Sequence, residues 1–390
     1  MKIENNLNKI KNKKEKSKFL TFLLVVFLIV FFIARYTTDE EFRTMIDVNV
    51  LKKEVEESTL TKIDIDLDSN PNIFAYDKYI AILTKNKLAQ YTEDGKKVSE
   101  LDTNISIPLV SKKGKYLVLA EKNGQKIYLI SGENIIWENT VEGNISEVNV
   151  NSNGYVSIII QNTTYKSVVA FYNLEGVELF RTYISANYAI CTDISTNNKY
   201  LAIGEVDYSG TILKSFIKII SVDKAQEDPN NSIIYTYESD NGEVITNINY
   251  HDKENAICMF NSYVQKVGID SNERVYDITD KDMFVDIDLN DTITIIDKQS
   301  SGLFSFEYEI LLKNTNNKLE SLYILDSDLP KMMTSSGNHF ALDLGNEIRI
   351  ISSNGWLTKK YTSNNQIKDI VIGDSIAGVI YKNKIEIIDL

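Results

Sequence analysis

Residues 371–388, VIGDSIAGVIYKNKIEII, align along their whole length with residues 74–91, FAYDKYIAILTKNKLAQY. Each segment reads as two β-strands around a tight turn, followed by a Lys-Asn-Lys turn and a third strand. The later copy stops at Leu390 after three strands, whereas a further strand, residues 61–68, precedes the first copy. We expect that strand to complete the last sheet, because a ring joined in this way has no open edge at its junction.

Between these two segments one pattern recurs, namely a turn followed by an aromatic residue and an apolar strand. The clear copies begin at Asp77, Gly114, Asn153, Asn198 and Asn338, and weaker ones begin near Glu254, Asp291 and Asp374. Eight starts, close to the period of about 40–45 residues of a WD40-like repeat, predict one four-stranded sheet per repeat. We therefore expect an all-β fold, a β-propeller over residues 59–390. Eight blades are favoured, and seven remain possible if one weak repeat elaborates its neighbour.

A second mark recurs later in the repeat, where an apolar strand ends in a turn that contains Gly or Asn. Such residues supply the positive φ that a tight hairpin needs. The strand after the turn often carries a large aromatic residue: Trp137, Phe180, Tyr276 and Trp356. Because the position repeats, we expect these aromatic side chains to pack between neighbouring blades.

An apolar segment precedes the repeats. Residues 19–34 read FLTFLLVVFLIVFFIA, sixteen residues without charge, between Lys18 and Arg35. As a helix they span about 24 Å, and the flanking basic side chains can reach the headgroups around a ~30 Å core. No small-x-small cleavage site ends the segment, so a single-pass signal-anchor is expected rather than a cleaved signal peptide. Seven lysines among residues 1–18, against two glutamates, predict a cytoplasmic N-terminus and an extracytoplasmic C-terminal domain in the cell membrane.

We divide the N-terminal region into a basic tail at residues 1–18, a transmembrane helix at 19–35 and a helical stalk at 36–58. Thr38, with Glu41 three residues later, forms the pattern of a capping box at the start of the stalk. Phe42, Met45, Ile46 and Val50 follow at helical spacing along one stripe. The stripe either packs on the domain beyond or pairs with another copy, and packing is favoured because three turns are short for a coiled coil.

The charge distribution bears on the class of partner. Residues 1–18 hold 7 of the 42 Lys+Arg and 2 of the 55 Asp+Glu, so the remainder has a net charge of −18. This sign argues against nucleic acid and against an anionic lipid surface as the main partner, because both need clustered positive charge. It is typical of a domain kept soluble by its acidity.

Two features fit disulfide or metal chemistry only in part. Cys191 and Cys258 lie inside apolar runs, so buried free thiols are favoured, although an extracytoplasmic location permits a disulfide. Two segments alternate carboxylates as a calcium loop does: Asp64-x-Asp66-x-Asp68 and Asp286-x-Asp288-x-Asn290. Both lack the glycine that the sixth position of such a loop requires, and half-exposed strands explain them without a metal. We predict no metal and no cofactor.

Catalytic motifs do not stand out. The chain has two histidines, His251 and His339, in predicted turns or strand starts, and it contains no Gly-x-Ser-x-Gly, His-Glu-x-x-His or phosphate-binding glycine loop. A pair of carboxylates on different blades could still cleave glycosides. The chain is therefore expected to be no enzyme, with an envelope glycan hydrolase as the alternative.

Three consecutive turns between second and third strands form the best candidate surface, because a propeller places such turns on one face. They cover residues 121–124, 162–167 and 205–210. Exposed tyrosines flanked by charge suit recognition, since the ring offers a broad contact area and a polar tip. The candidate binding residues are Glu121, Tyr165, Lys166, Glu205 and Tyr208; ordinary hairpin turns are the competing interpretation.

The combination resembles a family of uncharacterised bacterial proteins with one N-terminal membrane helix and a propeller-like ectodomain. The segments that carry the resemblance are residues 75–79, 153–155, 165–167, 208–211 and 355–357. Residues 132–137 also look like a blade of the quinoprotein type, which includes assembly scaffolds, but residues that would hold a quinone are not recognisable. The resemblance implies the architecture and no catalytic residue. We expect a membrane-tethered, non-enzymatic binding or scaffolding module whose partner is an envelope protein or glycan.

Overall fold

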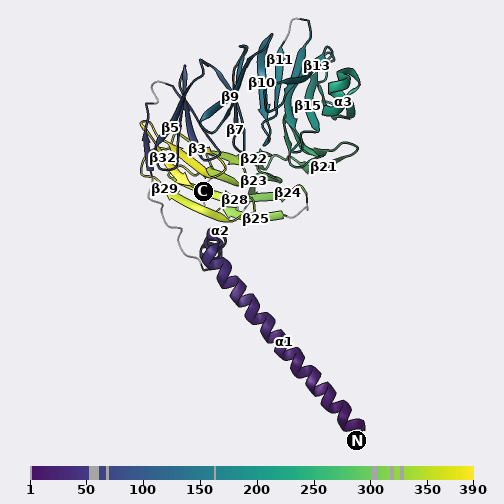
Figure 1. The fold of residues 1–390 in the computed structure, drawn as a ribbon, viewed down its shortest axis with the longest axis vertical. Coiled ribbons are helices and arrows are strands. Elements are labelled where there is room, and N and C mark those ends of the chain that lie inside the picture. The colour runs from purple at the N-terminus through teal and green to yellow at the C-terminus, as the bar shows by residue number, and fades with distance from the viewer. Residues whose placement is uncertain are drawn as a thin grey trace. The chain divides into compact units, whose positions relative to one another are not determined.

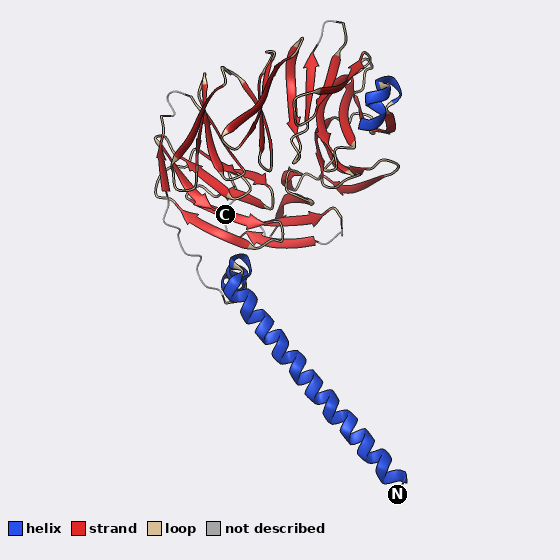
Figure 2. Ribbon diagram, in the orientation of Figure 1, coloured by secondary structure: helices blue, strands red, loops and turns tan. Residues whose placement is uncertain are grey.

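The chain divides into an N-terminal helical unit and a β-propeller (Figure 1). A computed structural model describes residues 2–51, 61–66, 70–161, 164–300, 306–316, 320–325 and 329–390. Within these residues the propeller consists of eight antiparallel sheets of four strands each (Figure 2). The all-β architecture and the count of eight blades are therefore confirmed.

The first four blades follow one another without exchange of strands. Blade 1 holds β2 (Asn72–Tyr76), β3 (Tyr79–Leu83), β4 (Lys87–Tyr91) and β5 (Lys97–Asp102); blade 2 holds β6 (Pro108–Lys113), β7 (Tyr116–Glu121), β8 (Lys126–Ser131) and β9 (Asn134–Thr140); blade 3 holds β10 (Asn144–Val150), β11 (Val156–Gln161), β12 (Ser167–Tyr172) and β13 (Glu178–Ile184); blade 4 holds β14 (Tyr188–Ile194), β15 (Tyr200–Asp207), β16 (Lys214–Ser221) and β17 (Ile233–Glu238). Between β16 and β17 blade 4 inserts α3 (Val222–Glu227) and a 3-10 turn (Pro229–Asn231).

The next three blades repeat this order, and the last one departs from it. Blade 5 holds β18 (Ile245–Tyr250), β19 (Ala256–Phe260), β20 (Tyr263–Val267) and β21 (Asn272–Asp277); blade 6 holds β22 (Asp282–Asp286), β23 (Thr292–Ser300), β24 (Phe306–Asn314) and β25 (Glu320–Leu325); blade 7 holds β26 (Met332–Ser336), β27 (His339–Asp343), β28 (Glu347–Ser352) and β29 (Leu357–Thr362); blade 8 holds β30 (Asp369–Ile372), β31 (Ile376–Ile380), β32 (Lys384–Asp389) and β1 (Thr61–Asp64).

Blade 8 closes the ring with a strand from the opposite end of the propeller sequence. β1 pairs antiparallel with β32, in a register that sets Thr61 opposite Ile387 and Ile63 opposite Ile385. The described part of the predicted closing strand, residues 61–66, includes β1, and residues 67–68 lie outside the described residues. Ile63 is buried in one apolar cluster with residues of blades 1 and 8, among them Ile80 and Ile380. The predicted closure is thus confirmed, and its apolar contacts join the first and last blades.

The burial pattern follows each strand's place in its blade. Contacts between β6 and β10, β10 and β14, and β14 and β18 show that the first strands of neighbouring blades meet at the centre of the ring. Second strands such as β7 are buried on both faces, because each face packs against another blade, and they read as continuous apolar runs. Fourth strands such as β9 alternate between exposed and buried positions, as expected of an outer edge.

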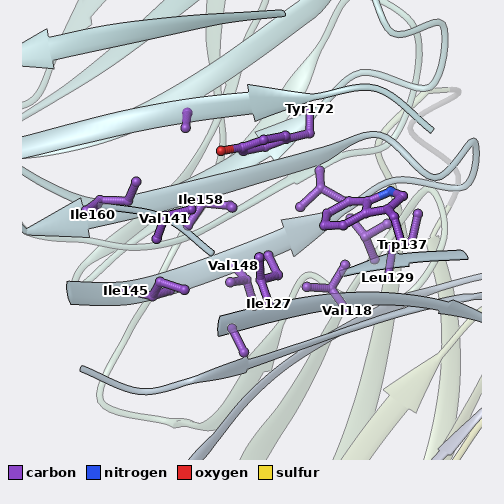
Figure 3. Close-up of a cluster of buried hydrophobic side chains, with 14 of the residues drawn as sticks. Val118, Ile127, Leu129, Trp137, Val141, Ile145, Val148, Ile158, Ile160 and Tyr172 are labelled. Carbon is purple, nitrogen blue, oxygen red and sulfur yellow. The ribbon is translucent and has the colours of Figure 1, made fainter. Parts of the chain in front are cut away.

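Aromatic side chains fill the space between blades at the predicted position. Trp137 of blade 2 is buried with residues of blade 3, and its ring lies 5.9 Å from that of Tyr172 between centroids (Figure 3). Gly176 lets this packing happen, since a Cβ atom there would stand 2.7 Å from Cγ of Trp137. Phe180 and Tyr276 pack into inter-blade clusters in the same way. Trp356 differs, because its side chain is 40% exposed.

A β-bulge recurs where the third strand pairs with the fourth in blades 1 to 5. In each case one residue of the fourth strand has no partner across the ladder: Val98, Ile136, Leu179, Ile234 and Val275. A bulge increases the local right-handed twist. The bulge thus lets the outer strand follow the twist of its blade, and in blades 2 to 5 the residue after it is aromatic: Trp137, Phe180, Tyr235 and Tyr276.

The two cysteines are buried free thiols. Cys191 on β14 and Cys258 on β19 belong to the same apolar cluster between blades 4 and 5. Burial raises the pKa of both thiols, which keeps them protonated. The disulfide left open by the sequence is therefore not formed in this structure.

The N-terminal unit is helical. α1 (Lys2–Thr38) contains the one stretch in the described residues that is long and apolar enough to cross a membrane, Leu20–Thr38. Its mean hydropathy is 2.4, and none of it is buried by the rest of the protein. α2 (Glu40–Met45) and a π-helical turn (Ile46–Val50) follow. The predicted capping box is wrong in detail: Thr38 still belongs to α1 and donates to the carbonyl of Ala34, while extended Asp39 caps α2. Residues 52–58 of the predicted stalk lie outside the described residues.

We predict that Ile63→Ala destabilises the propeller by about 2–5 kcal/mol, because it leaves a cavity in the apolar cluster that closes the ring. Chemical denaturation of the purified propeller measures this change. Asp64→Ala is the matched control, since Asp64 lies at an exposed position of the same strand.

Truncation tests the same closure. Removal of residues 1–57 should leave a soluble, folded propeller, whereas removal of residues 1–66 should expose the long edge of β32 and cause aggregation. Size-exclusion chromatography distinguishes the two. Equal behaviour of the two truncations would mean that β1 does not hold the ring closed.

Candidate functional site

The turns between second and third strands lie at one end of the propeller, because the strands alternate in direction within every blade. The connections between successive blades lie at the same end, where, for example, the N–H of Asn123 donates to the carbonyl of Ile145 at 2.8 Å. We call this end the turn face. It includes residues 122–125, the described part of the turn at 164–166, and residues 208–213; residues 162–163 lie outside the described chain.

Glu121, the first predicted site residue, accepts hydrogen bonds from backbone N–H groups of the turn face. Its carboxylate accepts hydrogen bonds from the N–H groups of Ser106 (2.5 Å) and Ile107 (3.1 Å). These residues belong to the connection between blades 1 and 2. Glu121 therefore fixes that connection, and its oxygens face the chain itself.

Glu205 is buried, with 1% of its surface exposed. Its Oε2 accepts hydrogen bonds from Lys218 Nζ (2.8 Å) and Asn187 Nδ2 (2.9 Å). A buried carboxylate needs such partners, because removal of a charge from water is costly. Glu205 thus ties β15 to β16 and to the connection before blade 4, below the surface.

Of the other three predicted residues, Lys166 and Tyr208 meet at the boundary between blades 3 and 4, whereas Tyr165 packs against the apolar cluster between blades 2 and 3. Lys166 Nζ lies 5.1 Å from the ring centroid of Tyr188 and 5.5 Å from that of Tyr208, and it donates to the carbonyl of Ala186 at 2.5 Å. The rings of Tyr188 and Tyr208 stack with centroids 4.7 Å apart. A cation within about 6 Å of ring faces is attracted by their quadrupoles.

A second aromatic pair is joined to these residues through the sequence, because Tyr165 directly precedes Lys166. Tyr165 and Tyr183 of blade 3 lie with ring centroids 4.8 Å apart. We call Tyr165, Lys166, Tyr183, Tyr188 and Tyr208 together the Tyr–Lys cluster. Its two outer rings remain open to solvent, Tyr183 at 54% and Tyr208 at 47% exposure.

Charge and neighbouring side chains complete the surface. Desolvation and the adjacent Tyr188 hydroxyl raise the pKa of Tyr208 to about 12, so its phenol is neutral at physiological pH and can donate a hydrogen bond. Ile212 and Leu213, in the same turn as Tyr208, are also exposed. The cluster therefore offers aromatic faces, phenol hydroxyls, aliphatic surface and one cation, a composition suited to binding a partner.

Sequence reasoning missed Tyr183 and Tyr188. Tyr188 starts the first strand of blade 4. Its position directly after a connection between blades could have identified it, because these connections lie on the turn face. Tyr183 lies on the outer strand β13 opposite Val168 of β12. Only the strand register brings it beside Tyr165, so no local pattern could have identified it.

At the opposite end of the inner strands, two lysines bond across several blades. Lys112 Nζ donates to the carbonyls of Ala75 and Ile372, both at 2.5 Å, and so joins blade 2 to blades 1 and 8. Lys113 Nζ donates to Asn249 Oδ1 of blade 5 at 3.1 Å. Burial lowers the pKa of Lys112 to about 8, and the two carbonyls supply the acceptors that its ammonium needs.

The calcium-like segment at residues 286–290 forms bonds between blades. Asp286 accepts from the hydroxyl of Ser335 at 2.7 Å, and Asp288 accepts from Asn247 Nδ2 at 3.0 Å. The N–H of Asn290 donates to the carbonyl of Gly337 at 2.9 Å. Among the described residues, no three His, Cys, Asp or Glu side chains are grouped so that they could hold a metal ion.

Glu147 is an unusual acid in the inner strand of blade 3. Its carboxylate accepts from the hydroxyl of Thr192 in blade 4 at 3.0 Å. The residue as a whole is partly exposed, but its carboxyl end is desolvated between the blades, which raises the pKa of Glu147 to about 8. The acid is therefore mostly protonated at neutral pH and serves the blade boundary as a neutral hydrogen-bonding group.

This shift predicts a pH dependence of stability. Between pH 4.5 and 8 the folded chain keeps the Glu147 proton that the unfolded chain has lost, so the free energy of unfolding falls as pH rises. The loss is at most about 1.4 kcal/mol per pH unit. Glu147→Gln should remove it, leaving stability similar near pH 4.5 and higher than that of the unchanged chain at pH 8–9.

Thermal unfolding across pH 4.5–9 measures this difference. Glu142→Gln, at an exposed position two residues before β10, is the matched control and should follow the unchanged chain. Parallel pH profiles of Glu147→Gln and the unchanged chain would show that the Glu147 carboxyl is not held protonated by the fold.

Residues 51–390 match the sequence profile of a family of unknown function, DUF5711, so the chain belongs to that family. No curated protein is detectably similar to the chain in sequence.

The chain is also similar, at low sequence identity, to several solved structures. BamB from Moraxella catarrhalis has a TM-score of 0.49 at 10% identity, with 85% of this chain and 97% of that chain covered. The Cps50 (Swd1) β-propeller domain from Myceliophteria thermophila has a TM-score of 0.44 at 12% identity, with 85% and 99% covered. Hydrazine synthase from Kuenenia stuttgartiensis has a TM-score of 0.43 at 9% identity, with 86% and 97% covered. No functional conclusion for this chain follows from these similarities.

Proposed function

We propose that this member of the DUF5711 family is a non-enzymatic binding module of the cell envelope, tethered to the membrane by α1 with its propeller outside the cytoplasm. The Tyr–Lys cluster is the observation that carries the proposal. Two of its tyrosines are about half exposed although each packs against another aromatic ring, Tyr183 tilted against Tyr165 and Tyr208 stacked on Tyr188. Exposed tyrosines held by ring contacts offer contact area at a low cost in side-chain entropy, which is why they recur as binding hot spots.

The cluster is also held in place by the propeller. Tyr183 belongs to β13 and Tyr188 belongs to β14, so strand ladders fix these two backbones, while Tyr165, Lys166 and Tyr208 lie in turns directly beside strand ends. The bond from Lys166 to the carbonyl of Ala186 crosses the boundary between two blades. A surface ordered before binding loses little conformational freedom when a partner arrives, and this favours affinity.

A partner protein of the envelope fits this surface best. Ile212 and Leu213 extend the aromatic faces with aliphatic side chains, and a protein interface combines such an apolar centre with polar groups around it. A glycan would use the same aromatic faces and is the alternative ligand. The net negative charge of the domain argues against nucleic acid.

The tether is supported by charge and length. The 19 residues Leu20–Thr38 rise about 28 Å as an α-helix, close to the thickness of a hydrocarbon core. The lysines before them favour a cytoplasmic N-terminus. The propeller then faces the envelope, where the Tyr–Lys cluster meets its partner.

We predict that Tyr183→Ala and Tyr208→Ala weaken partner capture without unfolding the propeller. Exposed positions usually change stability by no more than about 0.5 kcal/mol, whereas an interface tyrosine contributes about 2 kcal/mol to binding. Crosslinking of the membrane-anchored chain and pull-down, with identification of the captured protein, measures binding; thermal unfolding of the same variants measures stability.

Val177→Ala is the matched control, because Val177 is equally exposed in a turn at the other end of blade 3. It should leave capture unchanged. If the tyrosine variants lose capture only in proportion to their stability, or capture as much as the control, the Tyr–Lys cluster is not the binding surface.

The orientation has its own test. Protease added to intact protoplasts should remove the domain after Arg35 and spare residues 1–18. Protection of the propeller from protease would place it in the cytoplasm, and release of a shortened soluble chain during secretion would show that α1 is a cleaved signal peptide.

A further inference from the structure

After α1 the chain turns back along the end of the membrane-spanning helix. The ring of Phe42 in α2 meets that of Phe32 in α1 edge to face, with centroids 5.2 Å apart. The Arg35 guanidinium lies over the Phe42 ring at 5.0 Å. The short helix therefore contacts the last turns of α1 and does not simply continue it.

Hydrogen bonds hold the reversed segment against α1 at two places, one before α2 and one after it. Asp39 accepts from Arg35 Nη2 at 2.6 Å and from the N–H of Phe42 at 3.0 Å, which joins the end of α1 to the start of α2. Further on, the hydroxyl of Tyr36 donates to Asp47 Oδ1 at 2.6 Å. The bonds hold residues 39–47 against α1 from both ends of α2.

The reversal brings the chain back toward the apolar span. Phe32 precedes the end of α1 at Thr38 by six residues, or about 9 Å at 1.5 Å per residue. Phe42 contacts Phe32, so α2 lies alongside α1 within that distance of its end. An interfacial helix buries its apolar side about 5–10 Å into the boundary between headgroups and acyl chains, which is the same depth.

The side chains of this segment match such a position. Phe42, Met45 and Ile46 are half-buried, and Val50 and Leu51 are 62% and 53% exposed at its end. Large apolar side chains exposed next to a membrane span have acyl chains as their natural environment. Residues 39–51 carry four acidic residues and one arginine, so attraction to anionic headgroups does not support their binding.

We infer that residues 39–51 form a membrane-interface collar, which rests in the outer leaflet and sets the depth of α1. The inference rests on the proposed membrane tether. The collar binds the boundary between headgroups and acyl chains through apolar burial, and its lipid contact is therefore insensitive to salt and to anionic lipid. The linker to the propeller then starts at the membrane surface.

Site-directed spin labelling of the full-length chain in phospholipid vesicles tests the inference. Nitroxide labels are placed in three variants: Val50→Cys in the collar, Ile29→Cys in the apolar span and Glu175→Cys in an exposed propeller turn. The buried thiols of Cys191 and Cys258 are protected from the reagent, and the unchanged chain treated in parallel gives the background. The accessibility of each label to oxygen, relative to a water-soluble nickel complex, reports its depth.

The expected ratio at Val50 is several-fold higher than at Glu175 and lower than at Ile29, in vesicles of phosphatidylcholine alone and in vesicles that include phosphatidylglycerol. A Val50 label as aqueous as the Glu175 label, with Ile29 in lipid, overturns the collar and leaves the tether intact. An aqueous Ile29 label overturns the tether and the collar with it.

Release of the collar gives a second measurement. Phe42→Ala removes the ring that contacts Phe32 and Arg35, and should shift the label at Val50 toward water. Phe27→Ala is the matched control, since Phe27 lies in α1 as Phe32 does, is 67% exposed and stacks with Phe31 of the same helix. Equal depths of the Val50 label in both variants would show that the contact with Phe32 does not set its position.

Discussion

The pairing of β1 with β32 is the constraint on which the propeller depends. Seven blades are continuous in sequence, and each can form its four strands locally. The eighth has three strands until residues 61–64 arrive from the other end of the domain. The apolar contacts of Ile63 then join blade 8 to blade 1, and no long unpaired edge remains at the junction.

The two opposite faces of the closed propeller have different contacts. At the end of the first strands, Lys112 and Lys113 reach across several blades and satisfy buried acceptors. At the turn face, the connections are held by bonds from the chain itself, such as that of Glu121, and tyrosines are left over at the surface. At this face, glutamates such as Glu121 therefore bind the propeller's own backbone. The tyrosines beside Lys166 form the surface that we propose for binding.

The periodic features were accessible to sequence reasoning. Tight turns followed by an apolar strand repeat eight times, five of them with an aromatic residue at the start of the strand, because each blade packs in the same way against its neighbours. The closing strand could be anticipated since the last repeat lacks one strand. Tyr165, Lys166 and Tyr208 were also identifiable, because turns at the same step of successive repeats must share a face. Glu121 and Glu205 could not be distinguished from surface acids, as their backbone and side-chain partners come from other strands.

The sequence by itself determined the apolar helix, the all-β repeat and the strand that closes the ring, and it favoured eight blades over seven. These follow from local periodicity and from interactions that every repeat shares. Only the tertiary structure decided that Tyr183 and Tyr188 join the Tyr–Lys cluster, that Glu205 is buried, and that Phe42 turns back onto Phe32. Each depends on which side chains meet across strands or helices, and such contacts are set by register and packing, which leave no regular trace in a single sequence.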